Sequence, residues 1–366
     1  MELENERNEE NEIGTRYREY CGNLTRFING GCLSRFDRLL SLVLPGLPYR
    51  RNADCILREK GRLESCDFTE TLQTVSVAVK PYTGRNRHVI RMAEYLDTYL
   101  KDDLLVAFVA GSLGTGEEIR YSDFDGFVIL KDVVFQSRRR LIATARLLNK
   151  ALHIMLDFDP LQHHGWFVLA ESELRRFPDF YFPVSLLEYS RSIPGNKGFV
   201  QVVQVYRSDK EFRRSFRELS DGFSSSLRAI REPLDMYGLK SVLSQFMLLP
   251  SFYIQARTGV PIFKKFSFDE ARKEFSATEW SIMEEVSKIR EEWGYELTPW
   301  KRRVMTNPDP FMRRGSRRLS PKVPRKIRER LNPSFFNRME NLSCRMRERI
   351  CKPDASRTCS RENNYG

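Results

Sequence analysis

The chain has 366 residues, of which 41% are hydrophobic and 30% are charged, and its formal net charge is +12. Its length suits two domains with tails, and its hydrophobic share is enough for a buried core. The seven cysteines are an odd number and form no C-x-x-C pair, which argues against a closed disulfide set and against a zinc site.

The charges are concentrated at the two ends of the chain. Six of the first twelve residues are Glu, the opposite of the basic start of a secretory signal. Residues 301–366 hold 19 Lys and Arg against 6 Asp and Glu, so the first 300 residues are nearly neutral. No apolar stretch approaches the roughly eighteen residues of a membrane span. We therefore expect a soluble, cytoplasmic protein with a disordered acidic terminus over residues 1–12.

Residues 13–86 give few signals, and we assign them no fold. A loose alternation from Leu72 to Val79 indicates an added edge strand. From Arg87 to Asp102 apolar residues recur at spacings of three and four, which predicts a helix leading into the next strand.

Residues 104–130 carry the strongest chemical signal. An apolar run from Leu104 to Ala110 predicts a buried strand, Gly111-Ser112 a turn, and the residues up to Leu130 a second strand. Asp123 and Asp125 are two apart, so in a strand both carboxylates point to one face. Two carboxylates side by side repel, and a divalent cation between them removes that penalty.

The glycines of this stretch fit the same interpretation. Gly111, Gly114 and Gly116 allow close approach of a ligand, and Ser112 can donate to a phosphate oxygen. The alternative is an exposed acidic strand after an ordinary turn. The combination of apolar strand, Gly-Ser, a short gap and Asp-x-Asp favours a functional site.

Gly111-Ser112 followed by Ser122-Asp123-Phe124-Asp125 resembles the signature of the DNA polymerase beta-like nucleotidyltransferase superfamily. The likeness is greatest to its minimal and small-molecule nucleotidyltransferases. It implies an α+β fold with a mixed sheet and flanking helices, a nucleoside triphosphate substrate such as ATP, and two Mg²⁺ ions, with Mn²⁺ as a substitute. It also implies a third metal-binding carboxylate on a later strand.

That carboxylate is expected after a helix over residues 137–152. Residues 152–159 alternate apolar and polar, which predicts a strand with Asp157 and Asp159 on one face. Periodicity does not choose between them; Asp159 is preferred because it stands at the strand's end, and Asp157 is second. His163 and His164 follow in a turn, where one could orient a phosphate or help deprotonate an acceptor hydroxyl. The alternative is a structural hydrogen bond.

Further strands are expected at residues 166–169 and 199–206, which closes a nucleotidyltransferase core over residues 87–206. A helical domain over residues 207–299 follows, with helices predicted at 211–219, 237–258, 268–275 and 278–293. The resemblance implies that such a domain shapes the acceptor pocket. Lys264 is a candidate for binding the triphosphate across the cleft, although surface lysines without such a role are common.

Residues 300–366 are rich in Arg, Pro and Ser, which predicts a largely disordered basic tail. Such a tail attracts polyanions, including nucleic acid.

Two functions therefore compete. In the first, an acceptor oxygen attacks the α-phosphate of a nucleoside triphosphate, and metals held by Asp123, Asp125 and Asp159 stabilise the reacting oxygens. The acceptor is a small molecule, a protein or an RNA end. The second is a non-catalytic interaction protein of the same fold that binds nucleic acid through its basic tail.

Overall fold

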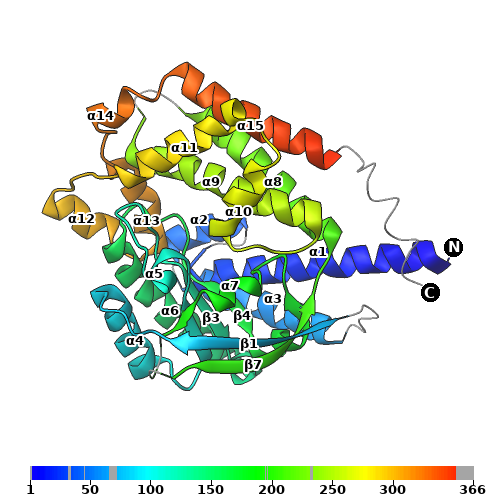
Figure 1. Cartoon of the computed structure of the whole chain (residues 1–366). Coiled ribbons are helices and arrows are strands. Elements are labelled where there is room, and N and C mark those ends of the chain that lie inside the picture. The colour runs from blue at the N-terminus through cyan, green and yellow to red at the C-terminus, as the bar shows by residue number, and fades with distance from the viewer. Residues whose placement is uncertain are drawn as a thin grey trace.

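A computed structural model describes residues 2–31, 34–44, 46–65, 72–193, 195, 197–230 and 234–351. One half of the molecule is a sheet with covering helices, and the other half is a layer of helices stacked above it (Figure 1). Each half has its own cluster of buried hydrophobic side chains. The predicted α+β class with a mixed sheet and a helical region is confirmed.

The sheet has seven strands in the order β4-β3-β2-β6-β1-β7-β5. They are β1 (Gln73–Pro81), β2 (Leu104–Val109), β3 (Gly126–Leu130), β4 (Phe167–Ala170), β5 (Phe177–Pro178), β6 (Arg191–Ser192) and β7 (Phe199–Tyr206). Strands β2 and β3 are antiparallel, and β3 and β4 are parallel. The expected edge strand is β1, but it lies between β6 and β7 rather than at an edge, because its long antiparallel pairing with β7 adds strands beyond it.

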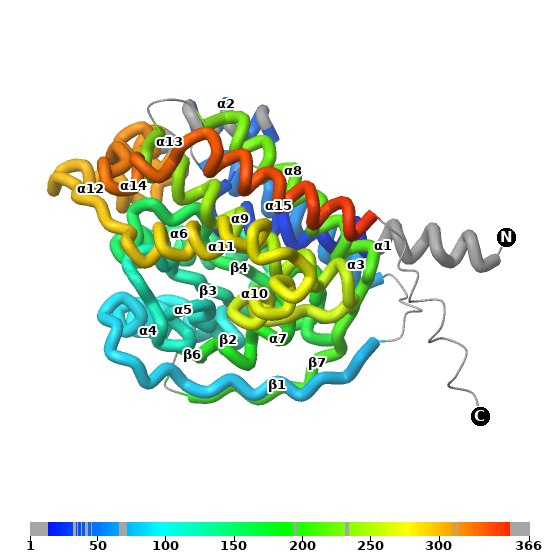
Figure 2. Tube along the Cα trace, turned by 45° about the horizontal axis from the view of Figure 1, so that its top comes forward, coloured from blue at the N-terminus to red at the C-terminus, as the bar shows by residue number. Residues whose placement is uncertain are grey.

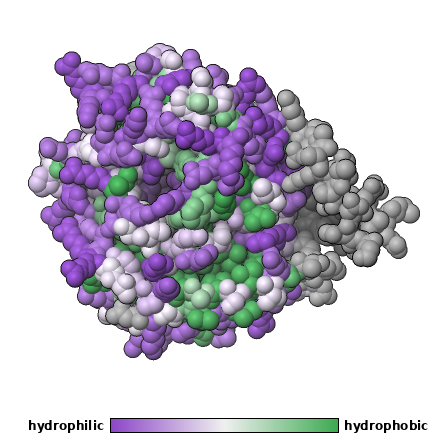
Figure 3. All heavy atoms as spheres, in the orientation of Figure 1, coloured by the Kyte–Doolittle hydropathy of each residue, from purple (hydrophilic) through white to green (hydrophobic). Residues whose placement is uncertain are grey.

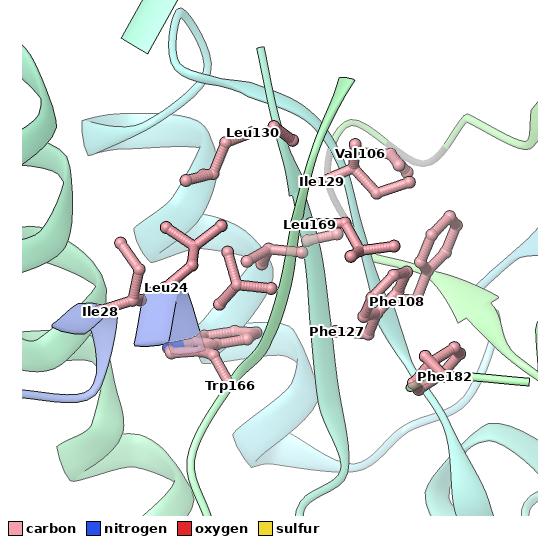
Figure 4. Close-up of a cluster of buried hydrophobic side chains, with 14 of the residues drawn as sticks. Leu24, Ile28, Val106, Phe108, Phe127, Ile129, Leu130, Trp166, Leu169 and Phe182 are labelled. Carbon is pink, nitrogen blue, oxygen red and sulfur yellow. The ribbon is translucent and has the colours of Figure 1, made fainter. Parts of the chain in front are cut away.

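Helices cover the sheet. They are α1 (Glu2–Ile28), α2 (Arg35–Val43), α3 (Leu47–Glu64), α4 (Arg87–Tyr99), α5 (Gly111–Thr115), η1 (Asp132–Gln136), α6 (Arg138–Phe158), η2 (Glu171–Arg176) and α7 (Ser185–Glu188). Leu24 and Ile28 of α1 pack beside Trp166 and Leu169 of the sheet (Figure 4). The described part of residues 13–86, which gave few signals, thus belongs to the sheet layer.

Helix α1 begins at Glu2, and the disordered terminus over residues 1–12 stays a prediction. The later turns are anchored by buried residues such as Tyr20 and Leu24, so the helix continues outward from a packed segment.

The strand predicted over residues 152–159 is also wrong, because helix α6 runs through it to Phe158. Ile154, Met155 and Leu156 are all buried, so this end of α6 is covered on more than one side. Burial on several sides hides the helical period and leaves an apparent alternation. Asp157 lies in the last turn of α6, whereas Asp159 is the C-cap residue with an extended backbone, so the two residues are not on one face of a strand.

The upper layer contains nine helical segments in the described residues. They are α8 (Asp209–Ala229), α9 (Met236–Thr258), α10 (Lys264–Arg272), α11 (Ala277–Glu291), α12 (Pro299–Met305), α13 (Pro310–Ser316), η3 (Arg317–Leu319), α14 (Arg325–Arg328) and α15 (Pro333–Cys351). Helix α15 lies against α8, α9 and α11, as Figure 2 shows.

The prediction of a disordered tail is consequently wrong for residues 300–351. Phe335, Met339, Leu342 and Met346 of α15 recur at spacings of three and four and are buried in the helical core. The arginines between them face outward, and several pair with glutamates, as Arg338 does with Glu285. The low hydrophobic content of this segment led to the prediction of disorder, although its few apolar residues form a regular stripe. Residues 352–366 lie outside the described residues.

We expect Met339→Ala to lower the free energy of unfolding by about 2–5 kcal/mol, because it opens a cavity in the helical core. Met312→Ala is the matched control, since Met312 is 37% exposed and should change little. Chemical denaturation of both variants checks this, and equal stabilities would contradict the packed position of α15.

Within the described residues, none of the helices combines the length and apolar character needed to cross a membrane. The face in Figure 3 is hydrophilic over the upper helices and more hydrophobic over the β1–β7 ribbon. Val200 and Val202 of β7 are exposed.

Candidate active site

The end of β2 and the start of β3 bring the Gly-Ser turn and the Asp-x-Asp motif together. Strand β3 begins at Gly126, so Asp123 and Asp125 lie in the segment just before it. The prediction that both stand within the strand is therefore wrong. Ala110 N–H donates to Asp125 C=O (2.8 Å), which fixes the two segments side by side. Gly111 has φ +60°, and a Cβ there would lie 2.2 Å from Asp125 Oδ2. Only glycine leaves the carboxylate this space.

The other residues of the turn are held by the protein itself. Ser112 lies in the short helix α5, and its hydroxyl donates a hydrogen bond to Ser122 Oγ (2.8 Å). Ser122 Oγ also accepts from Ile119 N–H (3.0 Å), so this contact ties the loop together. A Cβ on Gly114 would lie 2.7 Å from Tyr189 C=O, so close packing explains that glycine. Nucleotide binding by Gly111, Ser112 and Gly114 stays a prediction.

Sequence reasoning missed Lys240, the most buried cation of the site. Its side chain, on α9, has no exposed surface, and Nζ lies 2.7 Å from Asp123 Oδ1 and 2.5 Å from Asp159 Oδ2. Burial alone would raise the pKa of Asp123, but Lys240 and His164 outweigh it and lower that pKa. The available signal was a lone lysine in an otherwise apolar stretch of helix, between Leu239 and Val242.

The structure brings Asp159 to Asp123 and leaves Asp157 elsewhere. Asp159 Oδ1 accepts from Leu161 N–H (3.1 Å) and from Tyr295 O–H (3.2 Å), and Oδ2 accepts from Lys240. Burial raises the pKa of Asp159 against the opposing charge of Lys240. Its metal-binding role stays a prediction, and both of its oxygens already have partners in the protein.

Asp157 faces away from this cluster. Its carboxylate accepts from Arg91 (3.0 Å) and from Arg302 (3.1 Å), and His88 Nε2 lies 3.3 Å from it. Arg302 comes from α12, so this ion pair also joins the helical layer to α6.

The two adjacent histidines have different environments. His164 Nε2 lies 3.1 Å from Asp125 Oδ1. Burial opposes its protonation, but the hydrogen bond and charge of Asp125 outweigh this and raise the pKa of His164 to about 9. Burial lowers the pKa of His163 to about 3, and its Nε2 is buried with no hydrogen-bond partner among the described residues. At neutral pH, His164 is therefore charged and His163 is neutral.

Two further cations of the helical layer act on the carboxylates. Lys264, half-buried at the start of α10, feels the charges of both Asp123 and Asp125. Burial, reinforced by the charge of Arg290, lowers the pKa of Lys264 to about 8. The guanidinium of Arg290 stands 4.8 Å from the ring centre of Tyr121, and its Nε is buried without a hydrogen-bond partner in the described part of the chain. The helical layer therefore places two cations, Lys264 and Arg290, close enough to act on the carboxylates of the motif.

The donor set fits Mg²⁺ at Asp123 and Asp125. Each carboxylate has an oxygen that accepts no hydrogen bond from the described residues, and Gly111 leaves the space beside Asp125 Oδ2 open. No group of three or more His, Cys, Asp or Glu side chains suited to a metal occurs within residues the structure describes. Mg²⁺ commonly takes one or two carboxylates and completes its shell with water and substrate phosphates.

No model of a protein family matches the chain, and no curated protein matches it either. Among solved structures, the chain is similar to spectinomycin adenyltransferase AAD(9) from Enterococcus faecialis, crystallised with ATP and spectinomycin. The two sequences are 12% identical, and the match covers 64% of this chain and 99% of that one, with a TM-score of 0.30. At that score no residue role can be carried over, so the function must be argued from this chain's own geometry.

Proposed function

We propose that this chain is a metal-dependent nucleotidyltransferase that moves a nucleoside monophosphate from a nucleoside triphosphate to an acceptor and releases pyrophosphate. The observation that carries the proposal is the convergence of Asp123, Asp125 and Gly111 at the junction of β2 and β3. Asp123 and Asp125 would hold Mg²⁺, with Mn²⁺ as a substitute. When bound, the metal neutralises phosphate charge and stabilises the reacting oxygens.

Three side chains bind the triphosphate or position the metal ligands. Lys264 binds triphosphate oxygens from the helical side, and the Ser112 hydroxyl turns from Ser122 to a phosphate oxygen. His164 positions Asp125 through the 3.1 Å contact. An acceptor oxygen bonds to the α-phosphorus while the bond from that phosphorus to the bridging oxygen breaks, and pyrophosphate leaves with that oxygen.

Lys240 supplies a fixed positive charge beside Asp123. It keeps Asp123 ionised and oriented, and Asp159 in turn holds Lys240 in place. We therefore assign Asp159 to positioning Lys240, and the metal to Asp123 and Asp125.

The second candidate is a non-catalytic protein of the same fold. The observation that favours it is Lys240 itself, whose ammonium stands between two carboxylates where a cation is needed for charge balance. Pyrophosphate release separates the two candidates. We would incubate the full chain with each of the four triphosphates, Mg²⁺ or Mn²⁺, and an extract containing metabolites and RNA. Release that requires the divalent cation supports the enzyme, and no release with any triphosphate supports the second candidate.

The affinity for the triphosphate should fall as pH rises through about 8, because the pKa of Lys264 is lowered to about 8. The ammonium is charged below that pH and binds the anion, and above it the charged fraction falls about tenfold per pH unit. Lys264→Arg is the control, since guanidinium stays charged. KM for the triphosphate, measured from neutral pH upward, should rise in the wild type more steeply than in Lys264→Arg. Identical profiles would remove Lys264 from the triphosphate site.

A further inference from the structure

A second group of cations lies around Tyr237 and His163, and it comes from the segment that was predicted to be disordered. Arg313 on α13 and Arg317 at the start of η3 are four residues apart, and both act on Tyr237 of α9. The guanidinium of Arg317 lies 4.9 Å from the centre of the Tyr237 ring. Helices α13 and α10 lie apart in both views (Figures 1 and 2), so this group is separate from Lys264.

These two guanidiniums have no carboxylate partner among the described residues. Burial, together with the neighbouring Arg317, lowers the pKa of Arg313. Two like charges at this proximity repel, and the arrangement persists because the backbone around it is anchored. Met236 N–H donates to Pro321 C=O (2.8 Å), and Tyr237 N–H donates to Ser320 Oγ (2.9 Å). The protein thus holds a pair of positive charges without supplying an anion.

His163 extends this group toward the carboxylates. Its ring lies edge-on to Tyr237 with centroids 4.2 Å apart, and both Asp123 and Arg317 act on it electrostatically. Its Nε2 is the buried nitrogen that lacks a partner in the described structure. A buried polar atom without a partner costs about 1–3 kcal/mol, so it is a second observation that points to a missing ligand.

We propose that Arg313, Arg317, Tyr237 and His163, here called the acceptor cluster, bind a phosphate group of the acceptor. This inference rests on the proposed function and names its acceptor class: a phosphate-bearing anion rather than a cationic small molecule. Guanidinium groups match the geometry of phosphate oxygens, and the His163 ring nitrogen adds one hydrogen bond. Lys264 and Arg290 then bind the triphosphate, and the acceptor cluster binds the acceptor.

The test compares Arg313→Ala/Arg317→Ala with Arg325→Ala/Arg328→Ala in the full chain. The control pair removes the same charge from α14, where the side chain of Arg325 is 84% exposed. The probes are inorganic phosphate, a sugar phosphate and a 5′-phosphorylated oligoribonucleotide, with binding measured by calorimetry or anisotropy. Thermal unfolding checks that each variant is folded, and Arg317→Ala alone changes only an exposed side chain.

We expect the acceptor-cluster variant to lose about tenfold to a hundredfold in affinity for at least one probe, while triphosphate affinity and the control change less than about twofold. Tight, salt-sensitive binding of the oligoribonucleotide identifies a nucleic-acid acceptor, and preference for the sugar phosphate identifies a small one. Unchanged affinity for every probe overturns the inference, as does an equal loss of triphosphate affinity. Phosphate binding that depends on the cluster in a chain that binds no triphosphate would reject the proposed function and, with it, the acceptor role, but would keep the phosphate site.

Discussion

Asp125→Asn is expected to lower turnover about a thousandfold or more while leaving the protein folded. Asparagine keeps the shape of the side chain but removes the charge that holds the metal, and metal assistance contributes several kcal/mol at about 1.4 kcal/mol per decade. Asp125 is the better position for this test, because its side chain is 34% exposed and its ion-pair partner is His164. Asp123 also pairs with the buried Lys240, so Asp123→Asn combines loss of activity with loss of stability.

Asp157→Asn is the matched control for Asp125→Asn. Its carboxylate is also partly exposed and ion-paired, but its partners are Arg91 and Arg302 rather than the site. We expect its turnover to stay within a few-fold of the wild type. Steady-state kinetics with thermal unfolding of each variant checks both results. Wild-type turnover in Asp125→Asn would remove the metal from this motif.

Lys240→Met is expected to lower the free energy of unfolding by about 3–5 kcal/mol, because it leaves the buried carboxylate of Asp159 and the partly buried one of Asp123 without their counter-ion. Methionine has a similar length and no charge, so the change isolates the ammonium. Lys265→Met is the matched control: that lysine also makes a short ion pair, to Glu117, but it is 59% exposed. An exposed pair contributes about 0–1 kcal/mol.

Adding Asp159→Asn to Lys240→Met should recover part of the lost stability, since it removes one of the two uncompensated charges. Urea denaturation of the two single variants and the double variant gives the coupling energy. If the losses of unfolding free energy in the two single variants simply add in the double variant, the ion pair of Lys240 with Asp159 does not stabilise the fold. A Lys240→Met variant as stable as Lys265→Met would contradict a stabilising ion pair equally.

The parts of the fold that sequence predicted well show a clear local pattern. The apolar run before Gly111 became β2, the strand expected at residues 199–206 became β7, and the three-four spacing after Arg87 became α4. Helix α4 buries one face and shows the three-four spacing, whereas β2 is buried along nearly its whole length and is a continuous apolar run. At the end of α6 a helix is buried on more than one side, and its sequence shows a misleading alternation.

The basic C-terminal segment failed for a different reason. Its charge suggested disorder, but Phe335 and Met339 occupy a groove made by α8, α9 and α11. The apolar stripe of α15 is present in the segment, but its low hydrophobic content and high charge outweighed that signal in the prediction. Tertiary burial of a few apolar residues outweighed the repulsion among many exposed arginines.

The site was predictable only where its residues are close in sequence. Gly111 and Asp125 form a local motif, and its shape follows from two neighbouring strands. Lys240 lies 117 residues beyond Asp123, and Arg317 lies further still, so no spacing rule links them to it. Their positions depend on how the helical layer stacks on the sheet.

The most direct measurement is product analysis by mass spectrometry after incubation of the full chain with four triphosphates, Mg²⁺ and a phosphate-bearing acceptor mixture. We expect a product heavier by one nucleoside monophosphate, together with an equal amount of pyrophosphate, and neither in Asp125→Asn. A nucleoside diphosphate with inorganic phosphate, or the same products from Asp125→Asn, would contradict nucleotidyl transfer at this site.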